Sequence, residues 1–192
     1  MIVGIEKSKL KTLSSSLFFD ALLVVSASLL IGLLSQFELI LPFSPVPFTL
    51  QTFAVLLCGI LLGKSKGAVS VLLYLTEGAC GLPFFAGGSF GVHYIFGPTG
   101  GYLLGFILAA YIAGFFMEIG YGKSYLKMFP ALLVSNFSIY IFGLSYLSSF
   151  VGKNMVLQLG LYPFILSDIV KIVVLSLSVP LISKIVKLEE GF

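Results

Sequence analysis

Charged residues are scarce in this sequence, and arginine is missing altogether. Only 10% of the 192 residues are charged, whereas a soluble globular domain carries roughly 25%. Hydrophobic residues make up 58% of the chain, and its mean hydropathy is +1.12. So few charges cannot cover a water-facing surface, which points to the lipid bilayer as the solvent for most of the chain.

The small number of basic residues and cysteines excludes two further classes of protein. The net charge is only +3, and the lysines stand singly or in small groups between apolar runs. A nucleic-acid-binding protein would instead present a basic face with aromatic residues beside it. Cys58 and Cys80 both lie inside apolar stretches, which is typical of small membrane-embedded residues rather than of a disulfide or a metal site.

Apolar segments long enough to cross a membrane recur along the chain, at roughly 20 residues for each span. The first follows Lys7, Lys9 and Lys11 and is long for a cleaved signal, so we expect an uncleaved first helix. The second is short and could begin within a re-entrant loop. We predict an all-α integral membrane protein, a single domain over 1–192 that forms a compact six-helix bundle. The expected helices are 17–34, 48–63, 67–85, 100–118, 129–151 and 160–183.

The lysines between these segments indicate the orientation. Nine fall on one side of the predicted bundle and only Lys153 on the other, while Lys171 lies inside a span. By the positive-inside rule both termini are cytoplasmic, in a multi-pass protein of a prokaryotic plasma membrane. Lysine-rich and lysine-poor connections alternate along the chain, with both termini on the lysine-rich side, only if the number of spans is even. The nine are Lys7, Lys9, Lys11, Lys64, Lys66, Lys123, Lys127, Lys184 and Lys187.

The outward connections, 35–48, 84–99 and 152–159, differ in composition. The first is stiffened into an extended strip by Pro42, Pro45 and Pro47. The second is rich in glycine but also in aromatic residues, which flexible linkers do not usually carry. We interpret it as an ordered cap over a binding pocket, with anchoring at the membrane interface as the alternative.

Small residues recur on two of the predicted helices and allow another backbone to approach closely. On the fourth helix they stand four residues apart, which is typical of packing inside a bundle. The looser set on the first helix could face a neighbouring helix or a separate partner protein. The two sets are Gly101, Gly105, Ala109 and Ala113, and Ala21, Val25, Ser28 and Gly32.

Two near-motifs for catalysis lack the context that they need. The segment 59–65, GILLGKS, is one residue short of a P-loop and follows a membrane span rather than a strand. We therefore expect no ATPase in this chain. The segment 87–91, GGSFG, has the letters of a nucleophile elbow, with His93 nearby, but no strand–turn–helix context. A hydrolase is disfavoured, and we expect no catalytic residues.

The most informative ionisable residues are Asp168 and Lys171, inside the sixth predicted helix. Charged groups within a span are costly and usually face a cavity or each other. Their three-residue spacing places them on one helical face, near the outer end of the helix, and Glu77 lies at a comparable depth. One interpretation is a structural ion pair with Glu77 in its network. The other is a ligand site in which the carboxylate accepts ligand N–H groups and the ammonium faces a carboxylate.

Several blocks of this sequence resemble the BioY family, the substrate-binding (S) subunits of energy-coupling-factor (ECF) biotin transporters. Each block is weak alone, but together they keep their order across roughly residues 42 to 175. The blocks are SPVPFTLQTFAVLL at 44–57, GACGLPFFAGG at 78–88, FGPTGGYLLGF at 96–106, Pro163-Phe164 and Asp168-Ile169-Val170-Lys171.

This resemblance implies an outward-facing biotin pocket capped by the first and third loops, with no cofactor besides the transported ligand. It implies ligand contacts from Asp168 to the ureido ring and from Lys171 to the valerate, or the reverse. It also implies a transmembrane coupling protein and two ATPase subunits as partners. The alternatives are an S subunit for another small vitamin or organic acid, and an intramembrane enzyme. Further expected ligand contacts are Gln51, Gly87, Gly88, Ser89 and Tyr102, and the expected partner-docking residues are Ala21, Ser28 and Gly32.

The sequence departs from the family pattern at three positions. Ser89 stands where some relatives have Asn, and Leu103 where some have Arg. The second change leaves less positive charge near a ligand carboxylate, which could weaken binding or shift preference among biotin-like acids. Val25 interrupts the small-residue pattern of the first helix, so the expected docking surface departs there from the family pattern.

Overall fold

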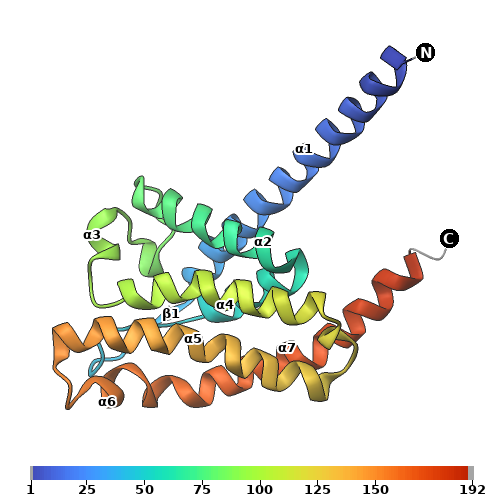
Figure 1. Cartoon of the computed structure of the whole chain (residues 1–192). Helices are drawn as coiled ribbons and strands as arrows, with labels where there is room; N and C mark the ends of the chain where they lie inside the picture. The colour runs from blue at the N-terminus through green and yellow to red at the C-terminus, as the bar shows by residue number, and fades with distance from the viewer. Residues whose placement is uncertain (1, 190–192) are drawn as a thin grey trace.

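The computed structural model describes residues 2–189, and their side chains from 17 to 180. Five helices in this part of the chain are long and apolar enough to cross a membrane. They are α1 Ile2–Ser35, α2 Gln51–Ala79, α4 Gly100–Glu118, α5 Tyr125–Val151 and α7 Tyr162–Glu189. The connections hold the shorter elements β1 Glu38–Leu39, β2 Phe48–Thr49, η1 Ala86–Gly88, α3 Val92–Ile95, η2 Tyr121–Lys123 and α6 Val156–Gly160. Figure 1 shows α2, α4, α5 and α7 side by side, and the predicted all-α membrane fold is confirmed.

Helix α2 is two antiparallel arms rather than one straight helix. Gly63 leaves the helical conformation, with φ 78° and ψ 176°, and the chain reverses there. A Cβ atom on Gly67 would lie 2.7 Å from the Cα of Gly59, so the arms touch beside the turn. At their far ends Gln51 Nε2 donates to Tyr74 Oη at 2.7 Å. If the two arms of α2 are counted separately, the described part of the chain has six long helical segments: α1, the two arms of α2, α4, α5 and α7.

The helix bounds differ from the expected ones around this hairpin. Its first arm begins at Gln51 rather than 48, because Phe48 and Thr49 form the short strand β2. Its second arm ends at Ala79 rather than 85, because Gly81 has φ 109° and Pro83 follows. The expected loop 84–99 also contains two short helical turns, η1 and α3.

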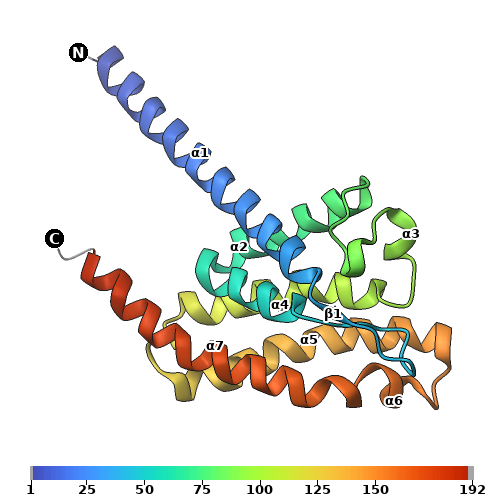
Figure 2. The same cartoon turned by 180° about the vertical axis from the view of Figure 1, so that it is seen from behind.

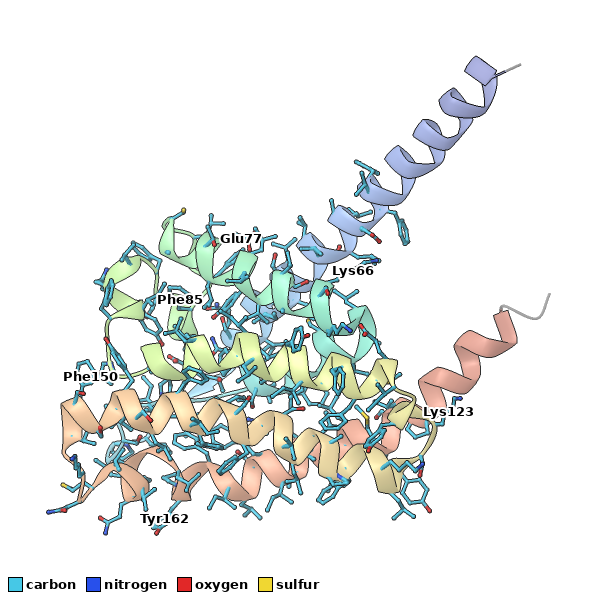
Figure 3. All side chains as sticks on the ribbon, viewed as in Figure 1. Lys66, Glu77, Phe85, Lys123, Phe150 and Tyr162 are labelled. Atoms are coloured by element: carbon cyan, nitrogen blue, oxygen red, sulfur yellow. The ribbon has the colours of Figure 1, made fainter. Side chains whose placement is uncertain are left out.

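The ends of the helices sort into two groups. The turn of α2 at Gly63, the α4–α5 connection and both termini lie at one end of the molecule, and α3 and α6 at the other (Figures 1 and 2). Figure 3 places Lys66 and Lys123 at the first end, and Lys153 follows α5 at the second. The side chains of Lys7, Lys9, Lys11, Lys184 and Lys187 lie outside the described residues. The cytoplasmic location of the termini stays a prediction.

Figure 2 shows the C-terminal part of helix α1 beside the bundle, while its backbone leans away from the other helices toward its start. Ser28 and Gly32, expected to dock a partner, are buried inside this chain, and Gly32 packs against the Phe84 ring. Ala21 is exposed, so it alone of the three expected residues faces outward. The exposed apolar face of α1 contains Leu17, Phe18, Leu22, Val25, Leu29 and Leu33.

The small-residue stripe of α4 packs inside the bundle. Gly101 lies against the backbone carbonyl of Phe142, and a Cβ atom on Gly105 would lie 2.8 Å from the Cα of Ile139. On its other side α4 touches the α2 hairpin, where Gly114 lies against the backbone of Lys64. Close contact on both sides makes α4 the centre of the bundle, which brings α2 and α5 near each other.

We predict that Gly105→Leu destabilises the protein, because the larger side chain would push α4 away from α5. Overpacking of this kind costs about 1–3 kcal/mol, which corresponds to a decrease in Tm of roughly 2–12 °C at this chain length. Thermal unfolding of the detergent-purified protein measures the effect. Ala21→Leu, on the exposed face of α1, should leave Tm unchanged. An unchanged Tm for Gly105→Leu would contradict the tight α4–α5 packing.

Candidate functional site

Asp168 and Lys171 form an ion pair on one face of α7. Lys171 Nζ lies 3.3 Å from Asp168 Oδ1, as the three-residue spacing predicts. Asp168 is 5% exposed and Lys171 is 9% exposed, so both charges are removed from solvent. Buried charges need partners that replace water, and the surrounding helices supply them.

The Asp168 carboxylate accepts hydrogen bonds from two other helices. Its Oδ2 atom accepts from Asn136 Nδ2 at 2.9 Å and from Tyr140 Oη at 2.5 Å, both on α5. Its Oδ1 atom accepts from Thr52 Oγ1, on the first arm of α2, at 3.5 Å and from Lys171. Four donors therefore surround the carboxylate, which stabilises its charged form.

The Lys171 ammonium is also fully engaged. Nζ donates to the Thr49 carbonyl oxygen at 2.8 Å, to Thr52 Oγ1 at 2.8 Å and to Asp168 Oδ1. These acceptors use all three N–H donors of an ammonium. The Phe48 ring lies 5.1 Å from Nζ and adds a cation–π contact. The pair is electrically neutral as a unit and ties α7 to the start of α2.

A cavity of about 50 Å³ lies against this pair. A volume of this size has room for only a few water molecules. Of the residues expected to bind ligand, it is lined by Gln51, Tyr102, Asp168 and Lys171. The remaining lining residues are Val46, Pro47, Thr49, Thr52, Tyr94, Thr99, Leu103, Phe106, Ile139, Tyr140 and Phe164.

The expected contacts Gly87, Gly88 and Ser89 do not line this cavity. A Cβ atom on Gly87 would overlap the carboxylate of Glu38, so this glycine is where the loop 84–99 packs against the loop 35–48. The Ser89 backbone closes the turn, because its carbonyl accepts from Phe85 N at 3.0 Å. In this conformation the three residues hold the cap together.

The cap reaches the cavity through aromatic residues. Phe85 is fully buried and stacks on Tyr94 with ring centroids 4.9 Å apart. Tyr94 and Thr99 from this loop line the cavity, together with Val46 and Pro47 from the proline-rich strip. Burial raises the pKa of Tyr94, so its hydroxyl remains protonated at neutral pH. This arrangement supports the interpretation of the second outward loop as an ordered cap.

Glu77 is not part of the Asp168–Lys171 network. It lies on the second arm of α2, far from α7 in Figure 3, and does not line the cavity. Its Oε2 atom is buried without a hydrogen-bond partner. The interpretation in which Glu77 joins a structural ion-pair network is therefore not supported, because the α2 hairpin directs its second arm away from α7.

Sequence reasoning missed Asn136 and Tyr140, which complete the carboxylate site. Both lie in the apolar segment expected at 129–151 and are buried. The signal that could have found the site was Asn136, a side-chain amide inside a span, since polar groups in a membrane usually face a cavity or a polar partner. Tyr140 carries no such signal, because aromatic residues are common throughout this chain.

We predict that Gly87→Ala loosens the contact between the loops 35–48 and 84–99. Its φ of 63° is unfavourable for alanine, and the added methyl group would displace Glu38. Hydrogen exchange should increase in 36–50 and 84–96. Gly81→Ala is the matched control, because Gly81 has φ 109° but a methyl group there would meet no atom within 4 Å. Equal exchange in both variants would show that strain alone, not the Glu38 contact, is responsible.

The fold and site define a multi-pass membrane protein with a cavity lined in part by a buried, neutral ion pair. The model of the BioY family matches residues 7–188. The chain therefore belongs to the BioY family.

The individual relatives agree with this membership. The chain is 43% identical over 164 residues to a "Probable biotin transporter BioY" of Pyrococcus horikoshii, covering 85% of this chain and 90% of the relative. It is 38% identical over 161 residues to a "Biotin transporter BioY" of Thermotoga maritima, covering 83% and 88%. The crystal structure of "the S-component for biotin from an ECF-type ABC transporter" superimposes with a TM-score of 0.75 at 25% identity, covering 93% of each chain.

Proposed function

We propose that this chain is the membrane subunit that captures biotin for uptake, binding it beside Asp168 and Lys171. The observation that carries the proposal is the buried, fully hydrogen-bonded ion pair that lines an otherwise largely apolar cavity. Ionisable groups are expensive inside a membrane and are usually functional. The biotin-transporter names of its relatives supply the ligand.

The chemistry of the cavity matches the head group of biotin. The ureido ring carries two N–H donors, for which the Asp168 carboxylate is the acceptor, and one carbonyl oxygen. Tyr140, Asn136 and Lys171 are the donors nearest to the carboxylate that could serve this oxygen. Phe106, Ile139 and Phe164 supply apolar walls for the fused rings.

Uptake of a ligand of this size requires the lining to move. The cavity is only about 50 Å³, so biotin must displace part of the wall. The outer wall is made of connections rather than spans, namely the strip around Val46 and Pro47 and the cap residues Tyr94 and Thr99. Connections of this kind rearrange more readily than packed helices. We propose that these two loops open to admit biotin from outside.

Release inward is proposed to depend on an ECF coupling protein and two ATPase subunits. The exposed apolar face of α1, which includes Ala21, is a surface on which a membrane partner could dock. The superimposed relative is itself a component of an ECF-type ABC transporter, which supports such a partnership. Both termini are proposed to be cytoplasmic, because the lysine-bearing turns share their end of the bundle.

Equilibrium binding of radiolabelled biotin to the detergent-purified chain tests the ligand and the site together. Asp168→Asn should weaken binding by about 100-fold or more, because the two ligand N–H groups lose a charged acceptor and hydrogen bonds to charged groups contribute about 1.5–3 kcal/mol each. Asp20→Asn is the matched control. Asp20 pairs with Lys66 at 2.5 Å near the other end of the bundle, so its loss should not change binding.

Two results would contradict the proposal. If well-folded wild-type protein did not bind biotin, biotin would be the wrong ligand, and other small vitamins would be screened. If Asp168→Asn bound biotin like wild type while keeping its Tm, the ion pair would be structural and the ligand would bind elsewhere.

A further inference from the structure

We propose that Tyr74 is a positioning residue for the cavity, holding lining residues from two different walls in place although it does not line the cavity itself. The residue lies near the end of the second arm of α2, is 0% exposed and is not among the lining residues. Its hydroxyl contacts Gln51 and its ring contacts Phe85. The effect on ligand binding rests on the proposed function, whereas the effect on the protein without ligand does not.

The Tyr74 hydroxyl fixes the orientation of Gln51. Gln51 Nε2 donates to Tyr74 Oη at 2.7 Å, and Gln51 Oε1 accepts from Thr49 Oγ1 at 3.3 Å. Both ends of the amide are therefore engaged. Gln51 is 5% exposed and lines the cavity, so the loss of the Tyr74 hydroxyl would leave a buried donor without its partner. Because such a group is costly, Gln51 would reorient.

The Tyr74 ring supports the cap, the loop 84–99. It packs edge-on against the Phe85 ring, with centroids 5.7 Å apart and an interplanar angle of 85°, which is a favourable arrangement for two aromatic rings. Gly78, one turn further along the same arm, makes room for Phe85, because a Cβ atom there would overlap that ring. Phe85 in turn stacks on Tyr94, which lines the cavity. Tyr74 thus supports Tyr94 through one intervening ring.

Phe85 is a fixed support because the start of the cap is fastened to the end of α1. Ser35 Oγ donates to the Phe84 carbonyl oxygen, and Gln36 Nε2 donates to the Phe85 carbonyl oxygen at 3.3 Å. Phe85 itself is 0% exposed. The backbone beside this ring is therefore held by hydrogen bonds, and Tyr94 stacks on a surface that is anchored independently of the rest of the cap.

The α2 hairpin creates this arrangement. Gln51 is the first residue of α2 and Tyr74 lies 23 positions later, and the reversal at Gly63 brings the two side chains together. The cap follows soon after the second arm, so Phe85 reaches the same tyrosine. Gln51 and Tyr94 come from different parts of the lining but share one support. Changes at Tyr74 should therefore separate into a hydroxyl effect on Gln51 and a ring effect on the cap.

Hydrogen exchange of the ligand-free protein tests the two effects separately. Tyr74→Phe keeps the ring and should increase exchange only around the start of α2, in 49–54. Tyr74→Leu removes the ring as well, so exchange should increase in both 49–54 and 84–96. Tyr146→Phe is the matched control, because the Tyr146 hydroxyl donates to the Phe96 carbonyl oxygen of the cap at 3.2 Å and neither residue lines the cavity. This control should leave 49–54 unchanged.

Binding of radiolabelled biotin tests whether Tyr74 acts through Gln51. Tyr74→Phe should raise the dissociation constant about three- to tenfold, the size expected for one lost hydrogen bond. Gln51→Met, which removes the amide but keeps the length of the side chain, should weaken binding at least as much. The double variant should bind like Gln51→Met alone, because the Tyr74 hydroxyl then has no amide to hold. The Tm of each variant is measured beside its affinity.

Several results would overturn the inference. Unchanged exchange in 49–54 for Tyr74→Phe, or losses of affinity that add in the double variant, would show that Tyr74 does not position Gln51. Unchanged exchange in 84–96 for Tyr74→Leu would show that the ring does not support the cap. If Tyr74→Leu does not fold, Phe85→Leu removes the same ring contact and takes its place. If wild-type protein did not bind biotin, the proposed function would fail, and the exchange experiment would still decide the role of Tyr74.

Discussion

The hydrogen-bonded pair of Asp168 and Lys171 is the interaction around which the outer half of this protein is organised. A charge inside an apolar bundle persists only if neighbouring elements solvate it. Asn136 and Tyr140 do so from α5, and Thr52 does so from the first arm of α2. The backbone of β2 takes part through the Thr49 carbonyl. One pair of charges therefore holds three helices and the proline-rich strip in register.

The donors to Asp168 can meet at one carboxylate because α4, which lies between α2 and α5, has a small cross-section. Glycine at 101, 105 and 114 lets α4 touch α5 on one side and the α2 hairpin on the other, backbone to backbone. Larger residues would separate α2 from α5, and the donors to Asp168 would no longer share one carboxylate. The small-residue stripe and the polar network are thus parts of one arrangement, although they lie on different helices.

The sequence predicted the helical membrane fold, the pairing of Asp168 with Lys171 and the position of α4, because each depends on local spacing. It separated the two arms of the α2 hairpin as the segments 48–63 and 67–85, but it did not predict how tightly Gly63 joins them, since a single positive φ has no periodic signature. Whether Glu77 joins the ion pair could not be decided from the sequence, because depth along a helix says nothing about which way that helix faces. Asn136 and Tyr140 were missed because their partner lies about 30 residues further along the chain.

The fold-back of α2 has a consequence for the surrounding lipid. Its 29 residues are shared by two arms of about 13 and 16 residues, which are roughly 20 and 24 Å long at 1.5 Å per residue. The hydrocarbon core of a bilayer is about 30 Å thick. Hydrophobic mismatch at this corner must therefore be relieved by thinning of the adjacent bilayer or by polar head groups drawn inward. We therefore expect the bilayer around the protein to vary in thickness and to be thinnest beside the α2 hairpin.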